Sequence, residues 1–288
     1  MLNASHVAKP LVSLESNKTF LDARNMMLRY NIKRIVITSP DHKKAIGIIT
    51  EKDIGKFLSN HLLHKRNVEE VKLSEFLDNN SKLYAVSRNA SLGICVQLML
   101  GKNISSLLIM DEDNQVNKII TETDLIALIA SRQFDNLIVS GYMTKNVITV
   151  SPEEDIAIVF DLLNRYKISR IIVIKENKPL GIITGRDIIP QRNFLNIDGH
   201  GREVENEGKR NRKLTVSNFT TPMTVKGIMT PNPLIIGEES SIDEAAKLMI
   251  ENRISGIPVI NKFQNLAGII TKTDIIRAIF DVGKKVKM

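Results

Sequence analysis

One arrangement of apolar and polar positions recurs four times along the chain. Each copy begins with a helical face at i, i+3, i+4 and i+7 from Phe20, Leu92, Ile156 and Ile242, and every position of these faces except Arg24 is apolar. An apolar run typical of a buried strand follows each helix, and the four runs read RIVIT, SLLIM, RIIVI and GIPVI. After a short polar connector, a second apolar strand ends each time in Ile-Ile-Thr.

A short motif closes each copy: GIITEKD at 47–53, KIITETD at 118–124, GIITGRD at 181–187 and GIITKTD at 268–274. Helical spacing resumes after the aspartate in three copies, whereas Pro190 interrupts it in the third. The repeating unit is therefore strand, helix, strand, strand, helix, and the fold class is α/β. A unit of this size cannot bury both faces of its sheet alone, so we expect the four copies to form two paired modules, stacked as a disk.

The spacing of the motifs predicts the domain organisation. We place repeat 1 at 1–66 and repeat 2 at 67–135, which form a first module, and repeat 3 at 136–190 and repeat 4 at 223–288, which belong to a second module at 136–288. The extra length between repeats 3 and 4, residues 191–222, has many charges and no sustained periodicity. It is predicted to be a long, flexible excursion.

Composition narrows the cellular setting. A single cysteine, Cys95, excludes an internal disulfide framework and fits a reducing compartment. It falls on the buried face of its predicted helix, where a small core residue is expected rather than a reactive thiol. The chain has no long apolar segment and no secretory signal at its start, so we expect a cytoplasmic protein without a membrane span.

The net charge of +8 indicates a surface that attracts anions, which include nucleic acids and polyphosphate ligands. The run KRNRK at 209–213 is the patch that favours nucleic acid, through an arm at 202–213. It lies beside the acidic VENEG, without a helix-turn-helix or zinc-finger spacing, and a solvated loop is the alternative that we favour. A basic scaffold or nucleic-acid-binding accessory protein remains the second functional class.

A threonine and an aspartate three residues later recur at the end of each motif. The pairs are Thr50 and Asp53, Thr121 and Asp124, Thr184 and Asp187, and Thr271 and Asp274. A carboxylate accepts hydrogen bonds from both hydroxyls of a cis-diol, and the threonine adds a donor and an acceptor, which suits a ribose. The same spacing is also a capping box that starts a helix. The two roles can coexist, since one carboxylate oxygen can cap while the other faces a ligand.

These motifs resemble the CBS (cystathionine β-synthase) domain family, whose usual ribose-binding signature is an apolar pair, Thr or Ser, two residues and Asp. The resemblance covers nearly the whole chain apart from 191–222, and four copies look like two Bateman modules. The architecture is similar to that of archaeal stand-alone four-CBS proteins and of the gamma subunit of AMP-activated protein kinase. This resemblance implies a flat disk with ligand clefts between paired units, which mostly take adenosine-containing ligands.

The resemblance also implies where phosphates would bind. The two residues after Ile32, Ile104, Ile168 and Ile254 enter the central hairpin, and in the kinase subunit such positions reach phosphates. They are Lys33 and Arg34, Ser105 and Ser106, Ser169 and Arg170, and Ser255 and Gly256. We expect Lys33, Arg34, Ser169 and Arg170 to be the main phosphate ligands, because the arginine fork can meet two phosphate oxygens at once. Lys52 and Arg186 are secondary candidates, and a solvated basic residue is the alternative for each. Repeats 2 and 4 lack these cations.

In the family, the segment that leads into the first strand makes backbone contacts to adenine. Here that segment includes Leu11, Leu83, Val147 and Pro233. Apolar packing is the expected role of these side chains themselves.

The expected function is non-catalytic, regulatory binding of AMP, ADP or ATP, by an energy-sensing monomeric disk or homodimer. A dinucleotide such as a diadenosine polyphosphate or cyclic di-AMP could span two paired clefts. We expect no enzymatic activity and no catalytic cofactor, because the repeats occupy the chain. We also expect no metal, because His61 and His64 lie one helical turn apart without further ligands of matching type.

Overall fold

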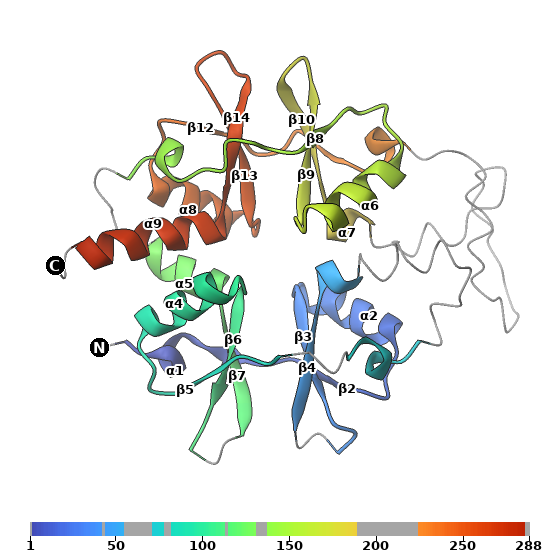
Figure 1. Ribbon diagram of the computed structural model, residues 1–288, viewed down its shortest axis with the longest axis vertical. Coiled ribbons are helices and arrows are strands. Elements are labelled where there is room, and N and C mark those ends of the chain that lie inside the picture. Colours follow the sequence, from blue (N-terminus) through green and yellow to red (C-terminus); the bar gives the residue numbers. More distant parts are fainter. Residues whose placement is uncertain are drawn as a thin grey trace, which may run out of the picture.

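Four similar α/β units lie in one plane, one in each quadrant of the molecule (Figure 1). The computed structural model describes residues 2–41, 44–54, 71–77, 82–112, 115–130, 137–188 and 224–285. Repeats 1 and 2 form the lower half in Figure 1, and repeats 3 and 4 form the upper half. The predicted α/β disk of four repeats in two modules is confirmed.

The first helix of each unit begins at the residue where its apolar pattern begins. These helices are α2 (Phe20–Tyr30), α4 (Leu92–Lys102), α6 (Ile156–Arg165) and α8 (Ile242–Glu251). The residue before each one is Thr19, Ser91, Asp155 or Ser241, and its side chain accepts a hydrogen bond from the first turn. Two of these helices, α2 and α4, end at a left-handed asparagine, Asn31 and Asn103.

An antiparallel hairpin follows each of these helices. The hairpins pair β3 (Arg34–Thr38) with β4 (Ala45–Thr50), β6 (Ser106–Met110) with β7 (Val116–Thr121), β9 (Arg170–Lys175) with β10 (Lys178–Thr184), and β13 (Gly256–Ile260) with β14 (Leu266–Thr271). A short strand before each helix pairs in parallel with the first hairpin strand; these strands are β2 (Ser13–Glu15), β5 (Ala85–Ser87), β8 (Thr149–Val150) and β12 (Ile236–Gly237). The hairpin turns point outward, so the threonine ends of the second strands point to the middle of the disk (Figure 1).

The closing helices start directly after the motif threonines. They are α5 (Glu122–Ile129) in repeat 2, α7 (Gly185–Ile188) in repeat 3 and α9 (Lys272–Lys285) in repeat 4. Repeat 1 begins a helix at Glu51, and its course after Ile54 lies outside the described residues. Pro190, the predicted excursion at 191–222, the basic arm at 202–213 and the pair His61 and His64 also lie outside them.

The segment that leads into each repeat crosses over to the other repeat of the same module. Each segment inserts one fully buried side chain, Ala4, Leu73, Val139 or Val225, into the core of its partner. Ala4 belongs to α1 (Ala4–Val7), and the others belong to short 3-10 helices. Two leads also add a strand to the partner sheet: β1 (Lys9–Pro10) pairs with β7, and β11 (Thr230–Pro231) pairs with β10. The two repeats of a module therefore share their cores.

The glycine that opens three of the motifs makes room for this crossing. A Cβ at Gly181 would lie 2.5 Å from the Met229 sulfur, and one at Gly268 would lie 2.7 Å from the Met143 sulfur. A Cβ at Gly47 would overlap the Leu77 side chain. In repeat 2 the glycine is replaced by Lys118, which pairs with Pro10 of the crossing strand β1.

The two modules are joined through repeats 2 and 4. Helices α4, α5, α8 and α9 pack together on one side of the disk, and their buried side chains form one continuous hydrophobic cluster (Figure 1). Cys95 and Ile126 of repeat 2 lie in this cluster with Ala246 and Ile275 of repeat 4. Repeats 1 and 3 have separate clusters, one around Phe20 and the other around Val159.

Among the described helices, none is long and apolar enough to cross a membrane.

Candidate functional site

The four motif pairs form the same hydrogen-bonded arrangement at the start of the closing helices. In repeat 2, the Thr121 backbone N–H and hydroxyl donate to Asp124 Oδ2 at 2.9 and 2.7 Å. In repeat 1, the corresponding distances from Thr50 to Asp53 Oδ2 are 2.8 and 2.6 Å. Repeats 3 and 4 repeat this geometry. The helix-capping role of the pairs is therefore present in every copy, and it uses one oxygen of each aspartate.

The other carboxylate oxygen, Oδ1, has a different environment in each repeat. Asp124 Oδ1 pairs with Lys9 Nζ at 2.7 Å, and Asp274 Oδ1 pairs with Arg277 at 3.1 Å. Asp187 Oδ1 accepts a hydrogen bond from the Thr230 hydroxyl at 3.0 Å. Asp53 is exposed, and its Oδ1 has no hydrogen-bond partner in the described part of the chain. A cis-diol could approach this oxygen without displacing any of the described residues.

Strand register brings the predicted phosphate residues next to the motif threonines. In the four hairpins, Arg34 pairs with Thr50, Ser106 with Thr121, Arg170 with Thr184 and Gly256 with Thr271. The carbonyl groups of Lys33, Ser105 and Ser255 also accept hydrogen bonds from the backbone N–H after the motif threonine of their own repeat, at 3.0, 3.1 and 3.3 Å. The predicted phosphate ligands and the predicted ribose-binding threonines therefore lie together at the inner ends of the hairpins.

Cations from the first and third repeats reach across the middle of the disk toward the other repeats. Lys33 Nζ donates to the Ser255 hydroxyl of repeat 4 at 2.7 Å, and Arg170 donates to the same hydroxyl at 3.0 Å and to Ser169 at 3.3 Å. The Arg170 guanidinium occupies the space that a side chain at Gly256 would fill. Repeat 4 lacks a cation of its own at these positions, and the fold supplies one from repeat 3.

Two charged residues in the centre were not among the predicted site residues. They are Glu122 and Lys272, each the first residue after its motif threonine, in repeats 2 and 4. The Thr273 hydroxyl donates to Glu122 Oε1 at 2.7 Å, and Lys272 Nζ donates to the Thr123 hydroxyl at 2.9 Å. The signal was present in the alignment of the repeats, where this position reads Glu51, Glu122, Gly185 and Lys272 and reverses its charge between repeats 2 and 4.

Burial and mutual charge perturb the titration of these groups. Desolvation lowers the pKa of Arg170 to about 10 and that of Lys272 to about 8, while the negative charge of Glu122 opposes both shifts. Desolvation also lowers the pKa of Arg34, against the attraction of Glu122, Asp124 and Glu51. Desolvation raises the pKa of Glu122, against the Thr273 hydrogen bond and the charges of Arg34, Lys272 and Arg170. Arg34, Glu122, Arg170 and Lys272 therefore interact electrostatically across all four repeats. Together with Lys33, which donates to the same Ser255 hydroxyl as Arg170, we call them the central charge cluster.

Other predicted residues lie elsewhere. Lys52 Nζ donates to the Lys167 carbonyl of repeat 3, so it joins the two modules rather than facing the central charge cluster. Val147 is partly buried in the segment before β8, and the Arg186 side chain lies outside the described residues. Cys95 is fully buried, and burial raises the pKa of its thiol to about 11, which fits a core residue. Within the described part of the chain, no group of three or more His, Cys, Asp or Glu side chains is placed to hold a metal ion.

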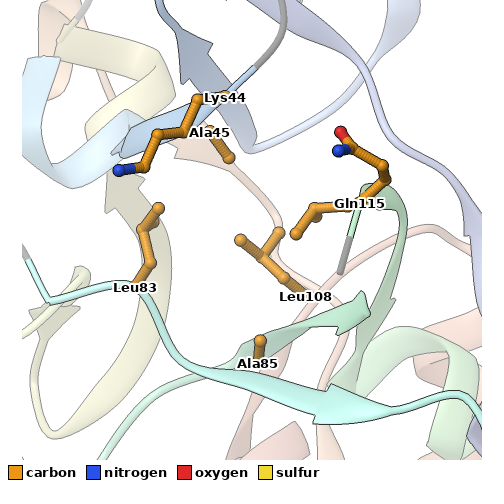
Figure 2. A pocket seen from close by; sticks show the side chains of 7 residues that line it. Lys44, Ala45, Leu83, Ala85, Leu108 and Gln115 are labelled. Carbon is orange, nitrogen blue, oxygen red and sulfur yellow. The ribbon is translucent and has the colours of Figure 1, made fainter. Parts of the chain in front are cut away.

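A cavity of about 380 Å³ lies between the sheets of repeats 1 and 2. It is lined by Lys44 and Ala45 of repeat 1 and by Leu83, Ala85, Leu108, Gln115 and Val116 of repeat 2. Figure 2 shows Leu83, Ala85 and Leu108 on one side of the space and Ala45 opposite them, with the polar ends of Lys44 and Gln115 at its edges. Leu83 is one of the residues predicted to lie beside a base. A flat, largely apolar group of the size of a purine suits such a lining.

The cavity and the motif are within reach of one small ligand. Leu108 pairs with Ile119 and Ser106 pairs with Thr121, so Leu108 lies two residues, or about 7 Å, along the strand from the motif threonine. The apolar lining of the cavity, the pair Thr121 and Asp124, and the central charge cluster therefore follow one another toward the middle of the disk.

The fold defines a tandem-repeat α/β protein of two paired modules, with a cavity between the paired repeats of the first module. The chain belongs to the CBS domain family, which it matches at residues 4–60, 73–131, 139–191 and 225–281. These segments begin at or next to the four residues that cross into the partner repeat.

Similar proteins are found in archaea and in humans. It is 25% identical over 281 residues to protein MJ1225 of Methanocaldococcus jannaschii, covering 93% of this chain and 95% of that protein. The crystal structure of MJ1225, described as a candidate archaeal homologue of the AMP-activated protein kinase gamma subunit, superimposes with a TM-score of 0.81 at 24% identity, over 96% of this chain and 100% of that one. The human kinase subunit gamma-3 is 24% identical over 197 residues, which cover 63% of this chain and 40% of that subunit.

Proposed function

We propose that this protein is a non-catalytic regulatory protein that binds an adenosine nucleotide in the clefts between its paired repeats. The observation that carries the proposal is the convergence at the disk centre of the Thr–Asp pairs with cations from neighbouring repeats. A ribose diol would bind Oδ1 of a motif aspartate, the oxygen that the helix cap does not use, and the phosphates would face the central charge cluster. The likeness to a candidate homologue of an AMP-activated kinase subunit supports the same class of ligand.

The cavity in the first module supports a position for the base. Its apolar lining and its distance of about 7 Å along the strand from Thr121 fit a base at the rim and a ribose at Asp124. Lys9 would have to release Asp124 Oδ1. The Lys9 side chain is 70% exposed but that of Asp124 only 3%, so the ribose hydroxyls would have to replace the ammonium group as partners of this buried carboxylate. In repeat 1, Asp53 is exposed and no described residue would have to be released from its Oδ1.

The direction in which the phosphates would point decides whether a mononucleotide or a dinucleotide fits the clefts. Because the cations of repeats 1, 3 and 4 meet in one cluster, two mononucleotides in facing clefts would bring their phosphates close together. AMP, ADP and ATP are the mononucleotide candidates, and a diadenosine polyphosphate or cyclic di-AMP is the dinucleotide alternative. The stoichiometry of binding separates the two: a dinucleotide that spans two clefts binds at half the stoichiometry of a mononucleotide and more tightly.

Asp53→Asn tests the ribose role without disturbing the helix cap. The asparagine carbonyl can replace Oδ2 in the cap, but its NH2 group donates where Oδ1 accepted, so the diol loses its acceptor. We expect AMP binding at that cleft to weaken at least about tenfold, with a small change in melting temperature, since a hydrogen bond to a charged group contributes roughly 1.5–3 kcal/mol. Isothermal titration calorimetry gives the affinity and the number of sites.

Asp22→Asn is the matched control. Thr19 and Asp22 form the same capping box at the start of α2, at 2.9 and 2.8 Å, outside the motifs. This variant should bind AMP as the unmodified protein does. If the unmodified protein binds no adenosine compound, the four Thr–Asp pairs are helix caps alone and the proposal fails.

A further inference from the structure

Glu122 is a carboxylate placed among cations that the proposed ligand would need. Of the acidic groups that act on Arg34, Arg170 and Lys272, Glu122 has the largest effect on the pKa of each. It comes from repeat 2, whereas these three cations come from repeats 1, 3 and 4. The Thr273 hydroxyl holds Glu122 against repeat 4 at 2.7 Å, and from there the charge of this one carboxylate acts on cations of three other repeats.

Two other acids near the centre, Asp124 and Asp274, have cationic partners outside the cluster. Asp124 pairs with Lys9 at 2.7 Å, and Asp274 pairs with Arg277 at 3.1 Å. Glu122 instead accepts a hydrogen bond from the neutral Thr273 hydroxyl at 2.7 Å. That bond orients the carboxylate without neutralising it, so its charge acts on the central cations through space.

The position of Glu122 is held from two sides. Its backbone N–H donates to the Ser105 carbonyl at 3.1 Å, and it is the first residue of α5, where a negative charge is favoured by the helix dipole. The neighbouring residue Thr123 is bound by Lys272 Nζ at 2.9 Å. Repeat 2 therefore fixes the backbone of Glu122, while repeat 4 holds the side chains of Glu122 and Thr123.

We propose that Glu122 acts as a built-in competitor of ligand phosphates and limits the number of phosphates that the disk centre accepts. The inference rests on the proposed function, because it assigns charge selectivity to the same clefts. A ligand phosphate must approach the cations that Glu122 already attracts, and it is repelled by the carboxylate. The repulsion grows with the charge of the ligand, so the centre discriminates against the more highly charged nucleotides.

Glu122→Gln tests this role, because the amide keeps the shape and can still accept the Thr273 hydrogen bond while the charge is lost. We expect the affinity for AMP to rise about twofold and that for ATP to rise about tenfold or more, measured by calorimetry at low salt, where Coulomb interactions are least screened. Glu51→Gln is the matched control: the same position in repeat 1, where the charge acts less on Arg34 than that of Glu122 does. Its affinities should change less than about twofold for every ligand.

Inorganic phosphate, pyrophosphate and triphosphate serve as probes that carry no adenosine. If no adenosine compound binds but triphosphate binding strengthens in Glu122→Gln, the proposed function fails and the charge role of Glu122 holds. Equal gains for AMP and ATP, or weaker binding of both, overturn the inference.

Thr273→Val is a second variant, for the case that uncompensated cations prevent Glu122→Gln from folding. It removes the hydroxyl that orients Glu122 and leaves the charge balance unchanged. We expect the ratio of ATP affinity to AMP affinity to rise about threefold, which is less than in Glu122→Gln. No change in this ratio would likewise contradict the role of an oriented carboxylate.

Discussion

At the scale of single residues, the same side chains serve folding and the proposed ligand chemistry. Each motif aspartate uses Oδ2 to start a helix, and the surroundings decide what Oδ1 does: Lys9 occupies it in repeat 2, Thr230 in repeat 3 and Arg277 in repeat 4. Four nearly identical motifs therefore make four different sites. The helix-cap and ribose interpretations of the motif are compatible, because they concern different oxygens.

Lys272 makes the proposed phosphate binding depend on pH. It is 6% exposed, and desolvation first, then the charges of Arg170 and Arg34, lower its pKa to about 8. The phosphate of AMP is already a dianion at pH 7. Affinity for AMP should therefore fall as pH rises from 7 to 9, because the ammonium group loses its proton in this range. Calorimetry at pH 7, 8 and 9 measures the effect.

Lys272→Arg is the control, since an arginine stays protonated throughout this range. Its affinity should vary less with pH than that of the unmodified protein. The ligand-free protein should show the opposite trend in stability. The folded state releases the Lys272 proton at lower pH than the unfolded chain does, so the free energy of unfolding rises from about pH 8 toward 10.5. An affinity that is constant from pH 7 to 9 would place the ammonium outside the phosphate site.

At the scale of elements, the crossing lead segments make the module, rather than the repeat, the folding unit. Leu73 and Val225 are fully buried in a core built by the other repeat of their module. Strands β1 and β11 likewise complete the sheet of the partner repeat. A single repeat would lack part of its core and, in these cases, an edge strand.

Leu73→Ala tests the contribution of a crossing segment. It should lower the free energy of unfolding by about 2–5 kcal/mol, because it leaves a cavity in the repeat 1 core beside Phe20. Leu28 of α2 is 42% exposed, so Leu28→Ala should lower the free energy of unfolding by less than about 1 kcal/mol. Urea unfolding of both variants measures the difference. Equal small losses would show that repeat 1 is stable without the crossing segment.

At the scale of the whole molecule, the two modules are joined unequally. Repeats 2 and 4 share one hydrophobic cluster, whereas repeats 1 and 3 have clusters of their own. Lys52 bridges repeats 1 and 3 through the Lys167 carbonyl. We therefore expect repeats 2 and 4 to unfold locally as one unit, because apolar side chains of both repeats form the same hydrophobic cluster.

Ile126→Ala and Ile171→Ala compare the two sides. Both residues are fully buried, Ile126 in the shared cluster and Ile171 in the repeat 3 cluster. Ile126→Ala should raise amide hydrogen exchange in α5, α8 and α9 alike, while Ile171→Ala should raise it in repeat 3 and leave repeat 2 unchanged. A local effect of Ile126→Ala, confined to repeat 2, would mean that the modules are energetically independent.

Local pattern was sufficient for the elements and for the fold class. The four helices begin at Phe20, Leu92, Ile156 and Ile242 as predicted, and the runs RIVIT, SLLIM and GIPVI are the strands β3, β6 and β13. These features depend on side-chain periodicity and capping residues, which are local in sequence. The repeat boundaries and the ligand-contacting roles of the site residues stay predictions.

By itself, then, the sequence determined the repeating α/β unit and its Thr–Asp motif, because both depend on residues that are close together within one repeat. It also determined the fourfold copy number, because the copies follow one another along the chain. Only the tertiary structure decided which repeats share a core, where the lead segments cross and which charges meet at the centre. Ser255 receives Lys33 from 222 residues away and Arg170 from 85, and Glu122 meets Thr273 across 151. Such contacts depend on how whole units pack, and electrostatic interactions between distant segments leave no periodicity in the chain.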